Sequence, residues 1–274
     1  MKKTSAIVLA GNGTNCERET AHACKLGGFD TIDIVAIWEL LNGDTTIDNY
    51  DFMVLPGGFL DGDDLGSGKA QANRILHSLD KKSGKPLIDQ VNRFIANGKL
   101  ILGICNGFQL MVKLGLTPAL DKKYTVQTAT LTNNDSGKFE DRWVWLKANP
   151  ASPCIFTKSI STIYLPIRHG EGKFIAADTA TLDRIKNENL SVLSYVDPVS
   201  KEPTQTYPDN PNGAQAAIAG VCDTTGRIFG LMPHPEAYVH RVNHPRWTRE
   251  KDLPEEGMGV ALFRNAHTYA KENL

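Results

Sequence analysis

The sequence predicts an α/β protein whose central sheet is mostly parallel, with helices on both faces and added antiparallel strands. Two features of the pattern carry this prediction. Up to Gly115, short apolar runs alternate with helical patterns at the spacing of right-handed βαβ crossovers. After Gly115, strand patterns follow one another with turn residues between them, which is typical of antiparallel strands.

The first half contains four short strand patterns, which we expect to form a parallel sheet covered on both faces. They are residues 6–10, 31–37, 52–55 and 100–104. The carboxyl ends of parallel strands meet at one edge of a sheet, where ligands gather. The segments that follow the third and fourth strands, Pro56-Gly57-Gly58 and Cys105, are therefore expected to share one cleft.

Helical patterns separate these strands. In the first, Thr14 or Asn15 is expected to cap a helix that ends at Gly27-Gly28. The others span 66–79, then Pro86 to Asn97-Gly98, and then the segment from Cys105 to Gly115. Proline suits the start of a helix and glycine its end, so the positions of these residues agree with the helix limits that the apolar periodicity predicts.

The second half is expected to add antiparallel strands at 143–146, 162–167 and 216–221, with a turn at 223–227 leading into 228–232. Two stretches rich in Asn, Asp, Pro and Gly, 133–137 and 197–213, are expected to be surface loops. Neither a linker nor a repeat divides the chain. We therefore expect a single domain over 1–274, with a C-terminal extension at about 237–274.

Composition excludes several classes of function. Thirty basic and thirty-one acidic residues give a net charge of −1, and no basic stripe suggests a nucleic-acid partner. The apolar run 6–10 is too short for a secretory signal, and none approaches membrane-spanning length, so a cytoplasmic protein without a membrane partner is expected. Five widely spaced cysteines without a C-x-x-C pair indicate neither a disulfide framework nor a metal site.

The segment Gly103-Ile104-Cys105-Asn106-Gly107 has the pattern of a strand that turns sharply into a helix. Small neighbours let the chain pass closely at such a corner, and the corner residue projects into a cleft. The N-terminus of the following helix favours a thiolate over a thiol. Cys105 is therefore the candidate nucleophile; the other four cysteines are interpreted as core or surface residues.

A cysteine nucleophile needs a base, and His234 is the best candidate among seven histidines. It lies in Pro233-His234-Pro235-Glu236, directly after a predicted strand. The prolines keep this segment extended, so Glu236 lies on the same side as His234 and can orient its ring. His240 and His244 are four residues apart, but Pro245 disfavours a helix there and hence a metal-binding pair.

Together these motifs resemble the signature of class I (triad) glutamine amidotransferases. Further segments are similar to the glutaminase of phosphoribosylformylglycinamidine synthase: Gly13-Thr14-Asn15-Cys16-Glu17, Pro56-Gly57-Gly58-Phe59, Phe139-Glu140-Asp141-Arg142-Trp143-Val144 and His169-Gly170-Glu171-Gly172. The resemblance implies a flavodoxin-like, three-layer glutaminase fold. It extends in order from the first strand to about residue 236.

The resemblance also implies roles for residues. Cys105 would attack the side-chain amide of L-glutamine, His234 would be general base and then acid, and Glu236 would hold the imidazole. The oxyanion would lie between the N–H of Asn106 and an N–H of the Gly57-Gly58-Phe59 loop. The family's usual substrate contact falls on Gln109. His169 and Glu171 are expected either to form a structural turn or to act in glutamine binding and partner signalling.

The ammonia would pass to a synthetase subunit, where ATP drives amination of formylglycinamide ribonucleotide to formylglycinamidine ribonucleotide in purine biosynthesis. The chain has no Walker-type phosphate-binding motif. No cofactor and no metal are therefore expected here, and ATP and Mg²⁺ are expected on the large synthetase subunit. Whether a small third subunit joins is left open.

Two features depart from the family pattern. Ala237 stands where an arginine usually follows the His-Pro-Glu segment, and the chain continues 38 residues beyond Glu236 with an end similar to that of the single-chain synthases. We expect this tail to pack on the glutaminase or its partner through Trp247, Leu253, Met258 and Phe263. Two alternatives remain: a stand-alone thiol hydrolase of the same fold, and a non-catalytic subunit that senses glutamine or scaffolds a complex.

Overall fold

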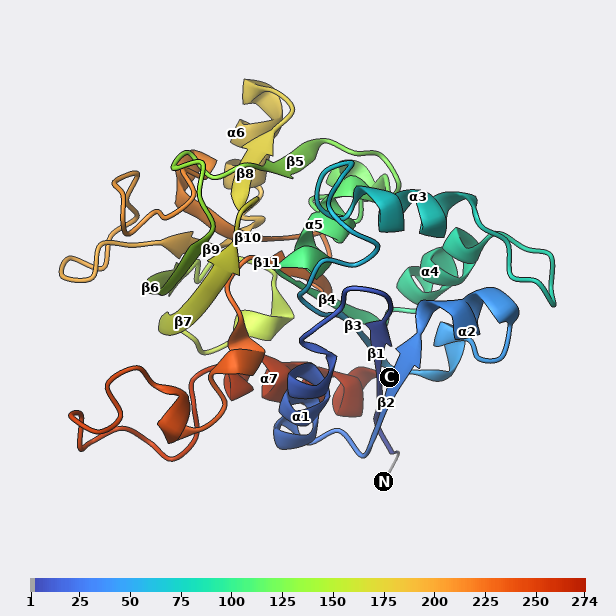
Figure 1. Cartoon of the computed structure of the whole chain (residues 1–274), viewed down its shortest axis with the longest axis horizontal. Helices are drawn as coiled ribbons and strands as arrows, with labels where there is room; N and C mark the ends of the chain where they lie inside the picture. The colour runs from blue at the N-terminus through green and yellow to red at the C-terminus, as the bar shows by residue number, and fades with distance from the viewer. Residues whose placement is uncertain (1–2) are drawn as a thin grey trace.

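The computed structural model describes residues 3–274, which are organised around one long mixed sheet (Figure 1). In chain order its strands are β1 (Ser5–Ala10), β2 (Thr31–Ala36), β3 (Phe52–Leu55), β4 (Leu100–Ile104), β6 (Glu140–Ala148), β7 (Thr162–His169), β9 (Ser191–Tyr195), β10 (Ile218–Cys222) and β11 (Ile228–Leu231). Their order across the sheet is β2-β1-β3-β4-β11-β10-β9-β6-β7. The predicted parallel sheet with added antiparallel strands is confirmed.

Five strands, β2-β1-β3-β4-β11, pair in parallel. This is the flavodoxin-like order, in which ligands bind outside the carboxyl ends of the strands. Strands β10, β9, β6 and β7 continue the sheet in antiparallel pairs. A separate two-stranded antiparallel sheet, β5 (Ala129–Thr132) with β8 (Lys173–Ala176), has no counterpart in the predicted elements.

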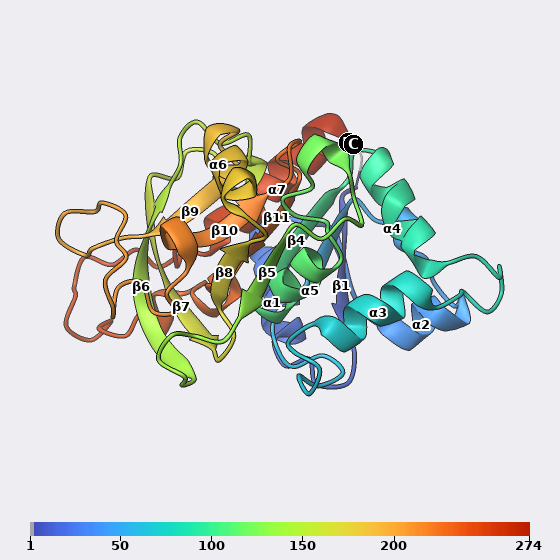
Figure 2. The ribbon, with the colours of Figure 1, turned by 90° about the horizontal axis from the view of Figure 1, so that it is seen from above.

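Helices cover both faces of the parallel half (Figure 2). Alternate residues of a strand point to opposite faces, and β1 shows this directly. Ala6 and Val8 belong to the same core as α1 and α7, whereas Ile7 and Leu9 belong to the core under α2, α3 and α4. The helices are α1 (Glu17–Gly27), α2 (Ile37–Asn42), α3 (Lys69–His77), α4 (Leu87–Ala96), α5 (Asn106–Lys113), α6 (Thr179–Asn187) and α7 (Val260–Asn273).

Single 3₁₀ turns connect several elements: η1 (Ile47–Asn49), η2 (Leu120–Lys122), η3 (Ile155–Thr157), η4 (Gln215–Ala217), η5 (Pro235–Ala237) and η6 (Arg241–Asn243). Over the residues that the structure describes, no helix is both long enough and apolar enough to cross a membrane.

The end of the chain packs on the parallel half of the fold. Helix α7 lies against α1, and Phe263 is fully buried with its backbone close to Gly27. Of the four tail residues, Phe263 packs in the core, and Sδ of Met258 accepts a hydrogen bond from the N–H of Tyr164 at 3.4 Å; packing of the tail on a partner stays a prediction. Trp247 and Met258 are exposed and Leu253 is half-buried, because the segment between η6 and α7 runs along the surface.

Local predictions differ from the structure at two places. Neither Thr14 nor Asn15 caps α1; the helix follows Cys16, and the Thr14 hydroxyl instead accepts a hydrogen bond from the N–H of Gly11 at 3.1 Å. The short helix α2 follows β2 without a break, so no turn residue marks its start, and the strand ends one residue earlier than expected.

Candidate active site

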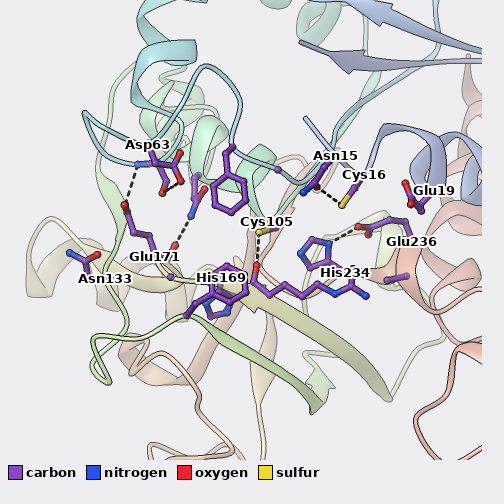
Figure 3. Close-up of a pocket in the computed structure, with 18 residues that line it drawn as sticks. Asn15, Cys16, Glu19, Asp63, Cys105, Asn133, His169, Glu171, His234 and Glu236 are labelled. Atoms are coloured by element: carbon purple, nitrogen blue, oxygen red, sulfur yellow. Dashed lines mark hydrogen bonds and ion pairs between the residues drawn. The ribbon is translucent and has the colours of Figure 1, made fainter. Parts of the chain in front are cut away.

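A cavity of about 380 Å³ opens at the carboxyl ends of β1, β3, β4 and β11. Its wall includes Cys105, His234 and Glu236, which the sequence places in two distant segments (Figure 3). The parallel order brings them together, because β4 and β11 are adjacent strands and the segments after them leave the sheet side by side. The shared cleft expected for the loops after β3 and β4 is also present.

Cys105 lies at a sharp corner between β4 and α5, with a positive φ of 52° that is unusual for a residue other than glycine. The corner is possible because Gly103 and Gly107 pack without side chains. A Cβ on Gly103 would lie 2.7 Å from the carbonyl oxygen of Gly107, and one on Gly107 would overlap the carbonyl of Leu55. The thiol of Cys105 faces the carbonyl oxygen of Arg168 at 3.5 Å.

His234 and Glu236 form a tight buried pair just after β11. The two atoms Nδ1 of His234 and Oε1 of Glu236 are 2.6 Å apart, and both residues are 2 % exposed. A carboxylate only accepts, so Nδ1–H donates and the tautomer is fixed. Nε2 of His234 has no hydrogen-bond partner within 3–274. Figure 3 shows Cys105 and Glu236 on opposite sides of the ring.

Charge at this pair controls the protonation of His234. Burial disfavours the imidazolium, but the charges of Glu236 and Cys105 outweigh burial and raise the pKa of His234 well above its ordinary value. The imidazolium is therefore held ready to give up a proton within the site. This is the protonation state that a departing amine requires from a general acid.

The glycine-rich loop after β3 lies directly beside this ring. A Cβ on Gly57 would lie 2.8 Å from Cε1 of His234, so this position must stay free of a side chain. Gly58 has a φ of +136° and packs against the backbone of Thr14. The N–H of Phe59 donates to the carbonyl oxygen of Gly13 at 2.8 Å. Of the three predicted donors, Phe59 is therefore already engaged.

A line of hydrogen bonds connects this loop to the turn after β7. The N–H of Leu60 donates to Oδ1 of Asn106 at 3.1 Å, and Nδ2 of Asn106 donates to Oε1 of Gln109 at 3.0 Å. Nε2 of Gln109 then donates to the carbonyl oxygen of Glu171 at 2.6 Å, and the N–H of Ser67 donates to the Glu171 carboxylate at 3.1 Å. Gln109 therefore has a bridging role that the sequence did not indicate.

His169 is buried at the end of β7 and holds this turn. Nδ2 of Asn134 donates to the carbonyl oxygens of Lys138 and His169, so Oδ1 of Asn134 is the acceptor that faces Nδ1 of His169 at 3.1 Å. Nδ1 therefore carries the proton, and the Nε2 lone pair has no partner among the described residues. Burial, together with the charge of His234, lowers the pKa of His169 to about 3. The ring is neutral at physiological pH.

Cys16 and Asp63 line the cavity without a role predicted from the sequence. Cys16 was interpreted as a core or surface cysteine, yet it lines the cavity, and its sulfur lies within 4.8 Å of ligand atoms of both His234 and Glu236. Its position in the segment after β1 could have indicated a place in the cavity, because this segment leaves the sheet at the same edge as Gly57 and Cys105. Burial raises the pKa of the Cys16 thiol.

The remaining predicted residues divide between the wall of the cavity and the layer behind it. Gly58, Phe59, Gln109, His169 and Glu171 line the cavity. Gly57 and Asn106 are buried in contact with residues that line it.

A cysteine, a histidine and a carboxylate in this order on a flavodoxin-like sheet indicate a triad glutamine amidotransferase. Comparison with known proteins agrees: residues 3–270 match the family model described as the CobB/CobQ-like glutamine amidotransferase domain.

Similar proteins show which family of glutamine amidotransferases the chain belongs to. The chain is 43% identical to the phosphoribosylformylglycinamidine synthase subunit PurQ of Dehalococcoides mccartyi, covering 99% of this chain and 100% of that one. It is 42% identical to the subunit PurQ of Methanococcus maripaludis, covering 96% of each chain. A chain of the structure of PurLQS from Thermotoga maritima superimposes with a TM-score of 0.69 at 30% identity, covering 98% of this chain and 99% of that one. The chain belongs to the family of phosphoribosylformylglycinamidine synthase PurQ subunits.

Proposed function

We propose that the chain hydrolyses L-glutamine to glutamate and ammonia and supplies the ammonia to a synthetase subunit, which converts formylglycinamide ribonucleotide to formylglycinamidine ribonucleotide with ATP. The observation that carries this proposal is the convergence of Cys105 with the buried His234–Glu236 pair in one cavity. The names of the relatives support the synthase reaction, and the PurLQS assembly supports partners of the PurL and PurS type.

The reaction starts at Cys105. Nε2 of His234, which is free of other partners among the described residues, holds the proton taken from Cys105, and the resulting thiolate attacks the side-chain amide carbon of glutamine. The tetrahedral intermediate then expels the amine as His234 returns the proton, which leaves a thioester on Cys105 and releases ammonia. Water adds to the thioester with His234 again as base, and glutamate leaves. Glu236 stabilises the imidazolium in both halves of the reaction.

The oxyanion is assigned to two backbone donors. Asn106 is the first residue of α5, where an N–H has no acceptor within the helix. Since the N–H of Phe59 is engaged with Gly13, the second donor is the N–H of Gly58. The loss of one such donor typically costs about 10²–10³ in turnover.

The far end of glutamine carries an ammonium and a carboxylate. Asp63 and Glu171 line the same cavity as Gln109, and Oδ1 of Asp63 is buried without a partner among residues 3–274. Burial and the charge of Glu171 raise the pKa of Asp63, a cost that a bound ammonium would offset. We therefore assign the substrate ammonium to these two carboxylates.

The remaining assignments concern the cofactors, the cellular location and the alternative functions. ATP and Mg²⁺ belong to the synthetase subunit, and this chain uses no cofactor for glutamine hydrolysis. We infer a cytoplasmic location from the proposed role in purine biosynthesis. The intact triad favours a catalytic subunit over a glutamine sensor, and the relatedness to synthase subunits favours it over a stand-alone thiol hydrolase.

The test uses the chain in complex with its synthetase subunit. Cys105→Ala is expected to abolish amination with glutamine and to leave amination with ammonium salts unchanged, because the synthetase site is intact. Cys24→Ala, at a buried cysteine of α1 outside the cavity, is the control and should keep both activities. Glutamine-dependent amination that survives Cys105→Ala would contradict the proposal.

A further inference from the structure

A thiol, an imidazole and a carboxylate converge at the side of the active site away from the nucleophile. One ligand atom from each of Cys16, His234 and Glu236 lies within 4.8 Å of the other two, and all three residues are buried. In Figure 3 Cys16 lies on the same side of the His234 ring as Glu236, opposite Cys105. These residues come from the segments after β1 and β11, so the sheet edge itself assembles the cluster.

The glycine at position 57 determines how closely the cluster can form. A Cβ there would lie 2.8 Å from Cε1 and 3.5 Å from Nδ1 of His234, and 3.4 Å from the sulfur of Cys16. The Cε1–Nδ1 edge of the imidazole and the thiol therefore face the same small space. The nitrogen presented to Cys16 is Nδ1, the one that now donates to Glu236.

One oxygen of the Glu236 carboxylate has no hydrogen-bond donor among the described residues. Oε1 of Glu236 accepts from His234, but Oε2 is buried without a partner within residues 3–274. A buried carboxylate oxygen without a donor is unfavourable, and a cation would satisfy it. The thiol of Cys16 now donates to Oδ1 of Asn15 at 3.0 Å. A metal would displace the thiol proton, and this hydrogen bond would then be lost.

We propose that Cys16, Nδ1 of His234 and Glu236 form a site for a thiophilic divalent cation such as Zn²⁺, and that its occupation switches the glutaminase off. Sulfur, nitrogen and oxygen ligands are the set that Zn²⁺ takes, and bonds of about 2.0–2.3 Å place tetrahedral ligand atoms roughly 3.3–3.6 Å apart. Ligand atoms already within 4.8 Å need shifts of roughly 1 Å to reach that geometry.

Charge and access also fit such an ion. Thiolate and carboxylate together neutralise a divalent cation, so binding buries no net charge. All three residues line the cavity that opens to solvent at the sheet edge, which gives an ion a path to them. The fourth position of the metal faces this cavity and is open to water.

Inhibition follows from the tautomer of His234 and rests on the proposed function. The ion replaces the proton on Nδ1, and a neutral imidazole bound through Nδ1 carries its proton on Nε2. The neutral, metal-bound ring releases this Nε2 proton far less readily than the imidazolium does, and Nε2 has no lone pair with which to take a proton from Cys105 or from water. The nucleophile and the oxyanion donors stay in place, but the base is blocked.

The first experiment measures binding without catalysis. Co²⁺ is titrated into the full chain carrying Cys105→Ala, and a thiolate-to-cobalt charge-transfer absorption is expected because Cys16 remains. The double variant with Cys16→Ala should lose this absorption, whereas Cys24→Ala in the same background should keep it. Absence of the band in Cys105→Ala, repeated in Cys105→Ser to exclude a folding defect, would overturn the site whether or not the chain is a glutaminase.

The second experiment tests the switch. Zn²⁺ is titrated into the complex with the synthetase subunit, and the activity of each variant is referred to its own value with a chelator present. Cys16→Ala should raise the inhibitory Zn²⁺ concentration by roughly tenfold or more, since loss of an outer-sphere partner alone costs 10–100-fold. Equal inhibition of both proteins would place the ion on Cys105 instead and refute the inference.

Discussion

The buried ring of His169 makes the stability of the protein depend on pH in a direction that can be measured. Burial and the charge of His234 lower the pKa of His169 from 6.5 to about 3. The unfolded chain therefore binds a proton on this ring more tightly than the folded chain. Stability is complete above the unfolded pKa and is lost as the pH falls from about 6.5 towards 3.

The size of the effect follows from the two pKa values. Each pH unit below 6.5 costs about 1.4 kcal/mol until the folded pKa is reached. At pH 5 the loss attributable to His169 is therefore about 2 kcal/mol relative to pH 8. That is a large fraction of the stability of a typical domain.

Urea unfolding of the wild type and of His169→Asn at pH 8 and pH 5 measures the contribution of His169 to the pH dependence of the free energy of unfolding. Asparagine keeps a donor towards Oδ1 of Asn134 but has no titrating ring, and groups such as His234 titrate in both proteins and largely cancel. The wild type should be more stable than the variant at pH 8, and this gap should shrink by about 2 kcal/mol at pH 5. His169→Gln should behave likewise. A gap that does not change with pH would refute the burial argument.

Three further changes test other parts of the structure. Gly107→Ala places a Cβ against the backbone of β3 and should lower the free energy of unfolding, measured with urea, by about 2 kcal/mol or more. The control is Gly170→Ala, whose Cβ meets its nearest atom at 4.0 Å and which should change this free energy by less than about 0.5 kcal/mol. Glu236→Gln removes the charge that holds the imidazolium and should lower the kcat of glutamine hydrolysis by about 10²–10⁴ while the protein stays folded by circular dichroism; an unchanged kcat would contradict the triad. Phe263→Ala should destabilise the chain by about 3–5 kcal/mol, against less than about 1 kcal/mol for the exposed Trp247→Ala; equal effects would mean that the tail does not stabilise the core.

The parallel half of the fold could be predicted because several signals agreed there. The runs 6–10, 52–55 and 100–104 are apolar throughout, and glycines after 6–10 and 52–55 mark where the backbone must turn. Cys105 could be identified for the same reason, since Gly103 and Gly107 are needed on both sides of the corner. Local chemistry and global topology point to the same residue.

The contents of the cavity behind that residue could not be predicted in the same way. Cys16 is near His234 because β1 and β11 end at the same edge of the sheet, and nothing local to residue 16 encodes that proximity. The bridging role of Gln109 depends on the carbonyl of Glu171, which belongs to another element. Sequence periodicity describes one element at a time, whereas these contacts join several.

The predicted cap of α1 is wrong for a different reason. Thr14 has the side chain of a helix cap, but its hydroxyl is used within the turn, by Gly11. Competing local hydrogen bonds of this kind are decided by the path of the backbone, which residue preferences alone do not specify.

The register between β4 and β11 has a consequence for how the active site can diversify. Ile104 pairs with Leu231, and the N–H of Cys105 donates to the carbonyl oxygen of Leu231 at 2.8 Å. Cys105 and His234 thus follow neighbouring strands, which backbone hydrogen bonds hold about 4.8 Å apart. The groups that we assign to the substrate belong to separate loops, such as the turn that holds Glu171. Reactivity and specificity can therefore change independently in this architecture: loops can be exchanged around a nucleophile and a base that follow adjacent strands of the sheet.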